Sequence, residues 1–306
     1  MTWEAREELR PRAFAIAYRI LGSVGDAEDV VQEALMRMHR AEEKGEQIES
    51  PAAYLSTVVT RLAIDELRSA RVRREHYVGE WLPEPLVTTE ADDPAHHAEM
   101  ADSLSLAFLV LLERLSPEQR AVFLLRDLFD YSYEQIAQII GRSEPAVRQL
   151  AVRARRQVAE GRPRFEASPE RRERLATQFF AAVEKGDLAG LESLLAADVT
   201  LHGDGGGVVP AITRPLHGRG RVARTLATWS RGAARFGGMT LRRCHVNGEP
   251  GAMAFGPDGG LFAVIALHVV DGEIHAVDAV VNPEKLDHLG MQVADTAALF
   301  RAARER

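Results

Sequence analysis

Residues 115–158 constrain the fold of this chain more than any other part of its sequence. Capping boxes begin at Ser116 and Ser132, because each serine is followed three residues later by a glutamine, and the pair can satisfy the free backbone groups of a helix start. The boxes predict one helix that ends near Leu128 and a short second helix that ends at Ile140. This part of the chain is therefore expected to consist of short helices.

A third helix is predicted after a tight turn at Gly141. Its apolar side chains recur every three or four residues, as on one face of a helix, at Val147, Leu150, Ala151 and Ala154. Residues 142–164 hold seven Arg and two Glu, a net charge of +5. A short helix, a glycine turn and a basic helix are typical of a helix-turn-helix that enters the major groove of DNA. The alternative is a solvated basic helix in an ordinary bundle.

The outer face of this third helix carries the side chains that would contact DNA. Arginine and glutamine near its start can read base edges, whereas the later arginines suit phosphates. The candidate DNA-contacting residues are Ser143, Glu144, Arg148, Gln149, Val152, Arg153, Arg155 and Arg156.

The length of 306 residues suits two or three domains, and a hydrophobic content of 46% is ample for their cores. A net charge of −7 does not by itself suggest a partner among nucleic acids, but the charge is unevenly placed. Residues 80–102 alone contain seven acids and no Lys or Arg. The single cysteine, Cys244, excludes a disulfide framework and a cysteine zinc cluster within one chain.

No apolar run approaches the roughly 20 residues that span a bilayer, and the charged N-terminus lacks the apolar core of a signal peptide. A cytoplasmic protein that makes no contact with a membrane is therefore expected. No spacing of residues indicates a metal site, and no cofactor is expected.

Residues 1–79 are predicted to form helices with apolar stripes. The first helix ends at Gly22, the second begins at Asp26 and the third opens at Ser50. The second leaves an acidic surface exposed, and the third leaves a basic face that continues into residues 69–74. Taken alone, this pattern is equally well explained by a helical bundle with a solvated basic edge.

Two blocks of sequence carry a resemblance to a known family. The segments DAEDVVQEAL and SPAAYLSTVVTRLAIDELRSARVRRE resemble region 2 of the extracytoplasmic-function sigma factors, and LSPEQRAVFLLRDLFDYSYEQIAQIIGRSEPAVRQLAVRARR resembles their region 4. The resemblance covers about the first half of the chain. It implies that region 2 binds the RNA polymerase core and melts the −10 element of a promoter, and that region 4 reads the −35 element.

The resemblance also assigns residues to these roles. The expected polymerase-binding residues are Asp26, Asp29, Gln32 and Glu33. The expected residues on the −10 side are Arg61, Asp65, Arg68, Arg71, Arg73 and Arg74. A melting domain needs cations for phosphates and a pocket for an extruded base, and the sequence shows only the cations.

The segment that follows region 2 has two prolines and no periodicity, which predicts a linker. Its apolar Trp81, Leu82 and Leu86 are costly to leave in water, which favours docking on a surface over a solvated tether. WLPEP at residues 81–85 resembles the linker of one sigma subgroup, which carries a SnoaL-like domain at its C-terminus.

The last part of the chain fits such a domain. Helices are predicted over 170–183 and 188–195 and around 222–229, and strands over 199–202, 239–246, 252–255, 261–270 and 274–281. Helices followed by antiparallel strands indicate an α+β fold, and the resemblance implies the cystatin-like cone of SnoaL-like proteins. DGGG at 204–207 and NPEKL at 282–286 resemble two further signatures of the subgroup.

These signatures are expected to contact the linker or the sigma regions and to regulate them. The residues expected at this regulatory contact are Trp81, Leu82, Pro83, Glu84, Pro85, Asp204, Gly205, Gly206, Gly207, Asn282, Pro283 and Lys285. A general base at Asp204 or Asp278, with His202, His268 and His275 around a cavity, is the enzymatic alternative. We expect no enzyme, because aspartates and glycines in loops mostly build turns.

The sequence therefore predicts an alternative sigma factor of several domains, two all-α and one α+β, whose partners are RNA polymerase core, promoter DNA and, as an open alternative, a small ligand of the SnoaL-like domain. The competing function is a DNA-binding metabolite sensor or enzyme. The predicted divisions are 1–79 (sigma region 2), 80–105 (acidic linker), 106–162 (sigma region 4), 163–170 (second linker), 171–290 (SnoaL-like domain) and 291–306 (tail).

Overall fold

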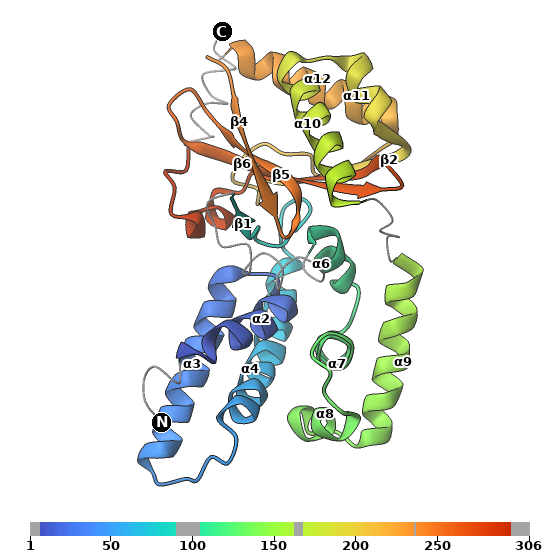
Figure 1. Ribbon diagram of the computed structural model, residues 1–306. Coiled ribbons are helices and arrows are strands. Elements are labelled where there is room, and N and C mark those ends of the chain that lie inside the picture. Colours follow the sequence, from blue (N-terminus) through green and yellow to red (C-terminus); the bar gives the residue numbers. More distant parts are fainter. Residues whose placement is uncertain (1–6, 90–104, 162–167, 236, 295–306) are drawn as a thin grey trace. The chain divides into compact units, whose positions relative to one another are not determined.

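The computed structural model describes residues 7–89, 105–161, 168–235 and 237–294 (Figure 1). The chain forms two compact units, one of residues 1–76 with 109–162 and the other of residues 77–108 with 163–306. The acidic residues 90–102, most of the second predicted linker and residues 295–306 of the predicted tail lie outside the described part of the chain.

The first half of the helical unit contains α2 (Arg10–Leu21), α3 (Val24–Glu43) and α4 (Pro51–Arg74). Each helix of this trio contacts the other two. α2 ends as predicted at Gly22, which takes a left-handed conformation. α3 begins two residues earlier than predicted, because the Ser23 side chain accepts a hydrogen bond from the backbone N of Asp26 and caps the helix there.

The second half contains the end of α6 (Leu106–Leu112), whose first three residues are grouped with the other unit, and α7 (Pro117–Asp127), α8 (Tyr133–Ile140) and α9 (Glu144–Gly161). Both predicted capping boxes form, at Ser116 and Ser132, and Gly141 has a φ of 66° at the end of α8. Buried Ile136 of α8 and Val147 of α9 share one apolar cluster with side chains of α7. The helix-turn-helix prediction is therefore confirmed.

The second unit packs three helices on a seven-stranded sheet. Its helices are α10 (Pro169–Lys185), α11 (Leu188–Leu194) and α12 (Arg219–Arg235), with two short 3-10 turns, η1 (Pro283–Lys285) and η2 (Asp287–Leu289), after the last strand. Its strands are β1 (Val87–Thr88), β2 (Leu195–Asp204), β3 (Leu216–His217), β4 (Thr240–Val246), β5 (Glu249–Phe255), β6 (Leu261–Val270) and β7 (Glu273–Val280). The helices lie together on one side of the sheet (Figure 1).

The sheet has the order β1-β4-β5-β6-β7-β2-β3 and departs from the antiparallel prediction at one place. β2 pairs in parallel with β7, while the other neighbours pair antiparallel. A parallel neighbour requires a long connection, and here the chain between β2 and β7 forms α12 and the four-strand run β3–β6. The prediction of an α+β domain is confirmed, with a mixed rather than an antiparallel sheet.

Two strands were not predicted from the sequence. β1 lies in the segment expected to be a linker, and its Val87 pairs with Val246 at the edge of the sheet. β3 is equally short and pairs with β2 at the other edge. A two-residue strand has no alternation of polar and apolar side chains, so backbone pairing to a sheet edge leaves no periodic signal. In the part of the chain that the structure describes, no helix is long and apolar enough to cross a membrane.

We expect Leu191→Ala in α11 to destabilise the C-terminal unit by about 2–5 kcal/mol, because it leaves a cavity in the core. Leu191 is fully buried among the core side chains, whereas Leu188 of the same helix is 39% exposed. Leu188→Ala is therefore the matched control and should cost about 0.5 kcal/mol or less. Hydrogen exchange of amides in β5 and β6 measures the opening of this unit. Equal losses of protection in both variants would contradict the packing of α11.

Candidate functional site

The outer face of α9 presents most of the residues predicted to contact DNA. Among them Ser143, Arg148, Gln149, Val152, Arg153 and Arg156 are exposed, and Glu144 and Arg155 are half-buried. Val152 is the most exposed apolar side chain of this face, at 65%. An exposed valine beside exposed arginines suits contact with a thymine methyl group more than it suits water.

Two of these arginines are held by side chains of the same unit. Arg148 pairs with Glu144 at 2.5 Å and lies 4.4 Å above the ring of Tyr133. Arg155 pairs with Asp127 at 2.8 Å and donates to the hydroxyl of Tyr133. Tyr133 thus orients both guanidinium groups. Since Arg155 joins α9 to the end of α7, its role in holding the helices together is at least as direct as a contact with phosphate.

The acidic surface of α3 is where the sequence placed it. Asp29 and Gln32 are exposed, while Asp26 and Glu33 are half-buried, and Glu33 pairs with Arg37 at 2.7 Å. Met36 on the same exposed side is 40% accessible. This face therefore combines carboxylates, an amide and an apolar side chain, as protein-binding surfaces do.

The basic face of α4 contacts the second helical half of its unit. Arg61 donates from Nε to the backbone O of Ile139 at 2.7 Å and from Nη2 to that of Gln138 at 2.9 Å. These carbonyls lie in the last turn of α8, where helices leave acceptors free and favour positive charge. Arg68 pairs with Asp65 of its own helix at 2.9 Å and with Glu118 of α7 at 2.8 Å.

The centre of this contact is Glu113, half-buried in the turn between α6 and α7. Its carboxylate pairs with Arg74 of α4 at 2.6 Å and with Arg120 of α7, whose side chain is fully buried. Arg120 also donates from Nε to the backbone O of Arg19 at 3.0 Å, and Arg71 donates to the backbone O of Glu113. Burial by itself raises the pKa of Glu113, but the two arginines outweigh it and hold that pKa below its ordinary value.

Most of the residues predicted on the −10 side are thus occupied within the unit. Arg61, Arg68, Arg71 and Arg74 bind atoms of residues 113–139, while Arg73 bonds to Ser69 and Glu66 of its own helix. Glu113 and Arg120 were not predicted from the sequence, because a charged pair in a helical segment is ordinarily a solvated pair.

The second site lies in the C-terminal unit, where Asp204 binds the linker. Its carboxylate is fully buried and accepts hydrogen bonds from the backbone N of Leu82 at 2.8 Å and from the hydroxyl of Tyr77 at 2.5 Å. Asn282 donates from Nδ2 to the same hydroxyl at 3.0 Å. Burial and the bond to Asp204 raise the pKa of Tyr77 far above its ordinary value, so this hydroxyl stays a donor.

Lys285 supplies the opposite charge at this site. Its ammonium pairs with Asp204 at 2.6 Å, donates to the backbone O of Leu82 and lies 4.1 Å above the ring of Trp81. The lysine is only 5% exposed, and an unpaired ammonium in such a place would be costly. Asp204, the linker carbonyl and the indole ring together compensate for its burial. The structure therefore brings together Trp81, Leu82, Asp204, Asn282 and Lys285.

The glycines after Asp204 leave room for this contact. Gly206 has a φ of 63°, and a side chain there would clash with the amide of Asn282. Gly207 has a φ of 73°, and its Cβ would lie 2.8 Å from Val78 of the linker. Both positions therefore require glycine for conformation and for space. Gly205 is equally confined by its own loop, and Pro283 begins η1.

Farther along, the linker binds by its backbone. Leu86 and Asn247 exchange hydrogen bonds, from Leu86 N to Asn247 Oδ1 at 3.0 Å and from Asn247 N to the backbone O of Leu86 at 2.8 Å. His288 bonds to the backbone O of Pro85 at 2.9 Å. Pro83 and Pro85 are buried, and Glu84 is half-buried. Asn247 and His288 were missed from the sequence, because turn residues such as asparagine carry no sign of what they bind.

A titratable cluster lies under the linker. His202 bonds to Glu80 at 2.8 Å and to the hydroxyl of Thr200 at 3.1 Å, and it is the pairing neighbour of Asp278. These residues of β2 and β7 alternate with Leu201 and Val277, which face the helices, so they lie on the other face of the sheet. Asp278 was the other candidate general base. It lies beside His202 on the neighbouring strand, on the face of the sheet that the linker covers, and not in a cavity among the helices.

Burial raises the pKa of Asp278 to about 6 against the opposing effect of His202. Burial would lower the pKa of His202, but its bond to Glu80 and the charges of Asp278 and Glu80 outweigh burial and raise it. Both groups therefore hold a proton more firmly in the folded unit than in the unfolded chain.

The chain matches three protein families in order. Residues 6–73 match the Sigma-70 region 2 family, residues 105–158 the Sigma-70 region 4 family and residues 176–283 the SnoaL-like domain family. Similar proteins include the ECF RNA polymerase sigma factor SigJ of Mycobacterium tuberculosis, which is 40% identical over 289 residues, 91% of each chain. The ECF RNA polymerase sigma factor SigG of the same organism is 32% identical over 90% of this chain and 79% of its own.

The fold is similar to that of a solved structure over nearly the whole chain. The crystal structure of the Mycobacterium tuberculosis extracytoplasmic function sigma factor SigJ has a TM-score of 0.75 and 35% sequence identity, and the match covers 94% of this chain and 98% of that one.

We expect the stability of the C-terminal unit to fall as pH rises, because its folded form binds more protons. The stability that protonated Asp278 contributes should be lost between about pH 4 and 6. The stability that protonated His202 contributes should be lost above about pH 6.5. Urea unfolding at pH 4, 6 and 8 measures this. In the wild type, the free energy of unfolding should fall by about 2–3 kcal/mol between pH 4 and 6, since one pKa unit corresponds to about 1.4 kcal/mol. In Asp278→Asn this fall should be absent.

The matched control is His217→Gln, which changes an exposed histidine of the same unit and should leave the slope as in the wild type. Parallel curves for the wild type and Asp278→Asn would contradict the assignment of the pH dependence to this cluster.

Proposed function

This chain belongs to the extracytoplasmic-function RNA polymerase sigma factors, and on that premise we propose how its parts bind polymerase and promoter. The protein is a sigma factor with a fused SnoaL-like domain. In our proposal α3 binds the polymerase core, α4 binds the −10 element and α9 reads the −35 element. Such a role places the protein in the cytoplasm.

Binding to the core is assigned to the acidic face of α3. Asp29 and Gln32 are exposed there, with Glu33 beside them and the apolar Met36 one turn further on. Charged residues around an apolar side chain give both steering and affinity to a protein interface. Binding of the −10 element is assigned to the basic face of α4.

Reading of the −35 element is assigned to the exposed start of α9. Arg148 and Gln149 are exposed in its second turn, where a recognition helix contacts base edges. Arg153 and Arg156 are exposed further along and suit phosphates. The pairing of Arg148 with Glu144 must open before a guanine can take the place of the carboxylate.

We further propose that the free protein holds its −10 side closed. The observation that carries this proposal is the binding of Arg61, Arg68, Arg71 and Arg74 to residues 113–139. While these contacts hold, the donors that the four arginines direct at carbonyls and carboxylates of residues 113–139 are not available to phosphate. Promoter binding therefore requires α4 to separate from α7 and α8, and polymerase or DNA must compensate for the lost contacts.

The SnoaL-like domain is proposed to regulate this separation through the linker. α4 ends at Arg74, and the chain is bound by the domain from Tyr77 onwards. After α9 ends at Gly161, the chain returns to the domain at α10. Region 4 is thus tied to the domain by both of its chain ends, and binding of the linker shortens the chain that is free to let the regions move apart.

An enzymatic role receives no support from the two candidate bases. Asp204 is saturated by the linker and Lys285, and Asp278 lies beside His202 and beneath Glu80. The matched relatives are named as sigma factors. We therefore propose a regulatory domain that binds protein segments and carries out no reaction of its own.

Glu113→Gln is expected to open the closed form. Removing one partner from a buried charged network costs about 3–5 kcal/mol, because the arginines remain buried without their carboxylate. Distances between spin labels at Arg40→Cys in α3 and Gln157→Cys in α9 should shift to longer, broader distributions, and transcription by the holoenzyme should increase.

Glu118→Gln is the control for this change. It removes a partner of Arg68, whose side chain is 52% exposed, so the expected effect is about 1 kcal/mol or less. Distances in Glu113→Gln that equal those of the wild type would show that these contacts do not hold the regions together. Asp204→Asn with Lys285→Met in the full chain tests whether release of the linker has the same effect.

Arg148→Ala is expected to change which −35 sequence the holoenzyme selects. Loss of one base contact costs about 1–3 kcal/mol and relaxes the preference at one position. Arg156→Ala should instead weaken binding to all sequences alike, because a phosphate contact carries no sequence information. Selection from a library of randomised −35 elements distinguishes the two. The assignment fails if wild type and Arg148→Ala select the same sequences.

A further inference from the structure

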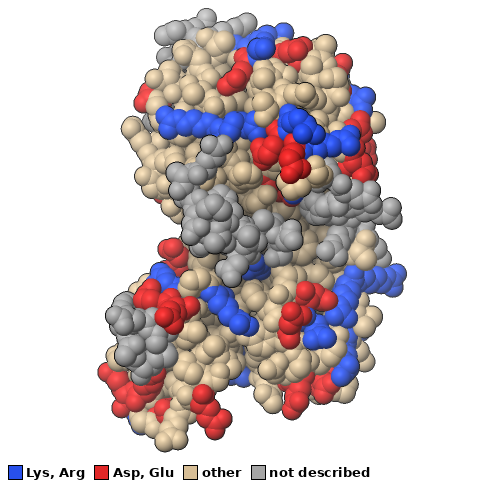
Figure 2. All heavy atoms as spheres, in the orientation of Figure 1, with Lys and Arg blue, Asp and Glu red and all other residues tan. Residues whose placement is uncertain are grey.

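One long stretch of the C-terminal unit contains no acid. Residues 205–248 include eight Arg and neither Asp nor Glu, although the whole chain has 45 acids and a net charge of −7. α12 lies within this stretch and contributes five of the arginines in 17 residues. Elsewhere, as on the face seen in Figure 2, basic and acidic side chains are intermixed. The absence of acids is therefore a local property of this stretch.

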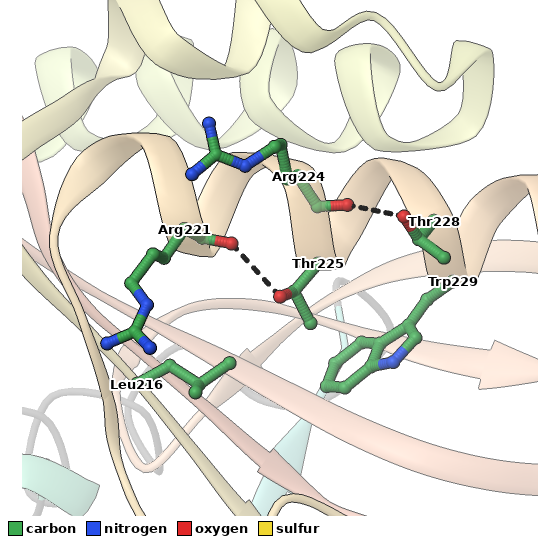
Figure 3. Close-up of a pocket in the computed structure, with 6 residues that line it drawn as sticks. All are labelled: Leu216, Arg221, Arg224, Thr225, Thr228 and Trp229. Carbon is green, nitrogen blue, oxygen red and sulfur yellow. Dashed lines mark hydrogen bonds between the residues drawn. The ribbon is translucent and has the colours of Figure 1, made fainter.

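The solvent side of α12 presents part of this charge in a hollow. Val222, Leu226 and Ala227 face the core, and the other side of the helix forms an open groove of about 360 Å³. The groove is lined by Leu216, Arg221, Arg224, Thr225, Thr228 and Trp229 (Figure 3). Arg221, Arg224 and Trp229 are exposed, the indole by 43%.

The two arginines in this groove differ from others of the same unit. Arg219 pairs with Glu273, and Arg243 pairs with Glu173. Within the described residues, neither Arg221 nor Arg224 forms an ion pair, and Glu192 of α11 is the acid that comes near Arg224. Two guanidinium groups one turn apart on a helix therefore face solvent with their charge available to a partner.

The form of the groove favours a polymer over a small molecule. Small ligands are held in enclosed, mostly apolar sites, whereas this groove is open and carries two charges. The hydroxyls of Thr225 and Thr228 donate to backbone oxygens of α12, at 3.0 and 2.7 Å, so the arginines and the indole N–H of Trp229 are the donors left for a ligand (Figure 3). Exposed arginines along a helix, with an exposed aromatic ring further along the same helix, suit a phosphate backbone (Figure 3).

The chain itself brings this domain close to DNA. α9 ends at Gly161 and α10 begins at Pro169, so eight peptide units separate them. Fully extended, they span at most about 28 Å, which corresponds to about eight base pairs of duplex. Whatever the orientation of the two units, a recognition helix bound at the −35 element keeps the SnoaL-like domain near the adjoining duplex at high effective concentration. This step rests on the function proposed above for α9.

We infer that the solvent side of α12, through Arg221 and Arg224 beside Trp229, binds the phosphate backbone of duplex DNA next to the −35 element. The contact reads no sequence, because it involves phosphates only. It makes the fused domain a third DNA contact of the promoter complex, in addition to regions 2 and 4.

The test uses the holoenzyme of the full chain and a promoter duplex recovered from the −35 selection, with binding measured over a range of salt concentrations. Arg221→Gln with Arg224→Gln should reduce the slope of log K against log salt by about 1.8, because each lost phosphate contact removes about 0.9. The selected −35 sequence should stay that of the wild type.

Arg171→Gln with Arg174→Gln is the matched control, since it removes the same charge from α10, where Glu170 and Glu173 alternate with the arginines. It should leave the slope as in the wild type. An equal slope in the Arg221, Arg224 variant would overturn the inference, and so would an equal reduction in the control. Weaker binding to core polymerase at an unchanged DNA slope would point to an acidic protein and overturn it as well. A wild-type holoenzyme without −35 preference would instead refute the proposed role of α9.

Discussion

The C-terminal unit depends on one buried ion pair, between Asp204 and Lys285. A buried carboxylate and a buried ammonium are costly to remove from water, and their mutual attraction compensates only if their other hydrogen-bonding groups are also satisfied. Here the backbone N and O of Leu82, the hydroxyl of Tyr77 and the ring of Trp81 satisfy them. Trp81 and Leu82 belong to the linker, and Tyr77 lies in the three residues that precede it. The charge pair thus needs the linker in place, and this gives the domain specificity for that segment.

A second carboxylate, the half-buried one of Glu113, joins separate helices of the helical unit by ion pairs. Glu113 lies between Arg74 of α4 and Arg120 of α7, and Arg120 reaches the backbone of Arg19. Charges and carbonyl contacts therefore contribute to the closed form that we propose. In our proposal the phosphates of DNA compete with these carboxylates and carbonyls for the same arginines. A hydrophobic interface between these halves would have no such competitor.

Much of the fold followed from local sequence. Serine caps, prolines at helix starts and glycines at helix ends act over a few residues, so α7, α8 and α9 were predicted with nearly their observed bounds. Strand edges were less well predicted, and β1 and β3 were missed, because pairing at a sheet edge depends on a distant partner. The parallel pairing of β2 with β7 was not predicted for the same reason.

The sequence by itself determined the order of the parts, the helix-turn-helix and the residues of the linker signatures, because each is written in short-range spacing. Only the tertiary structure decided what those residues bind. It brought Lys285 to Trp81 across 204 positions of the chain and set Arg61 on the last carbonyls of α8. It also left Arg221 and Arg224 without a carboxylate among the described residues. Pairing of charges depends on distance in space, and a sequence records distance only along the chain.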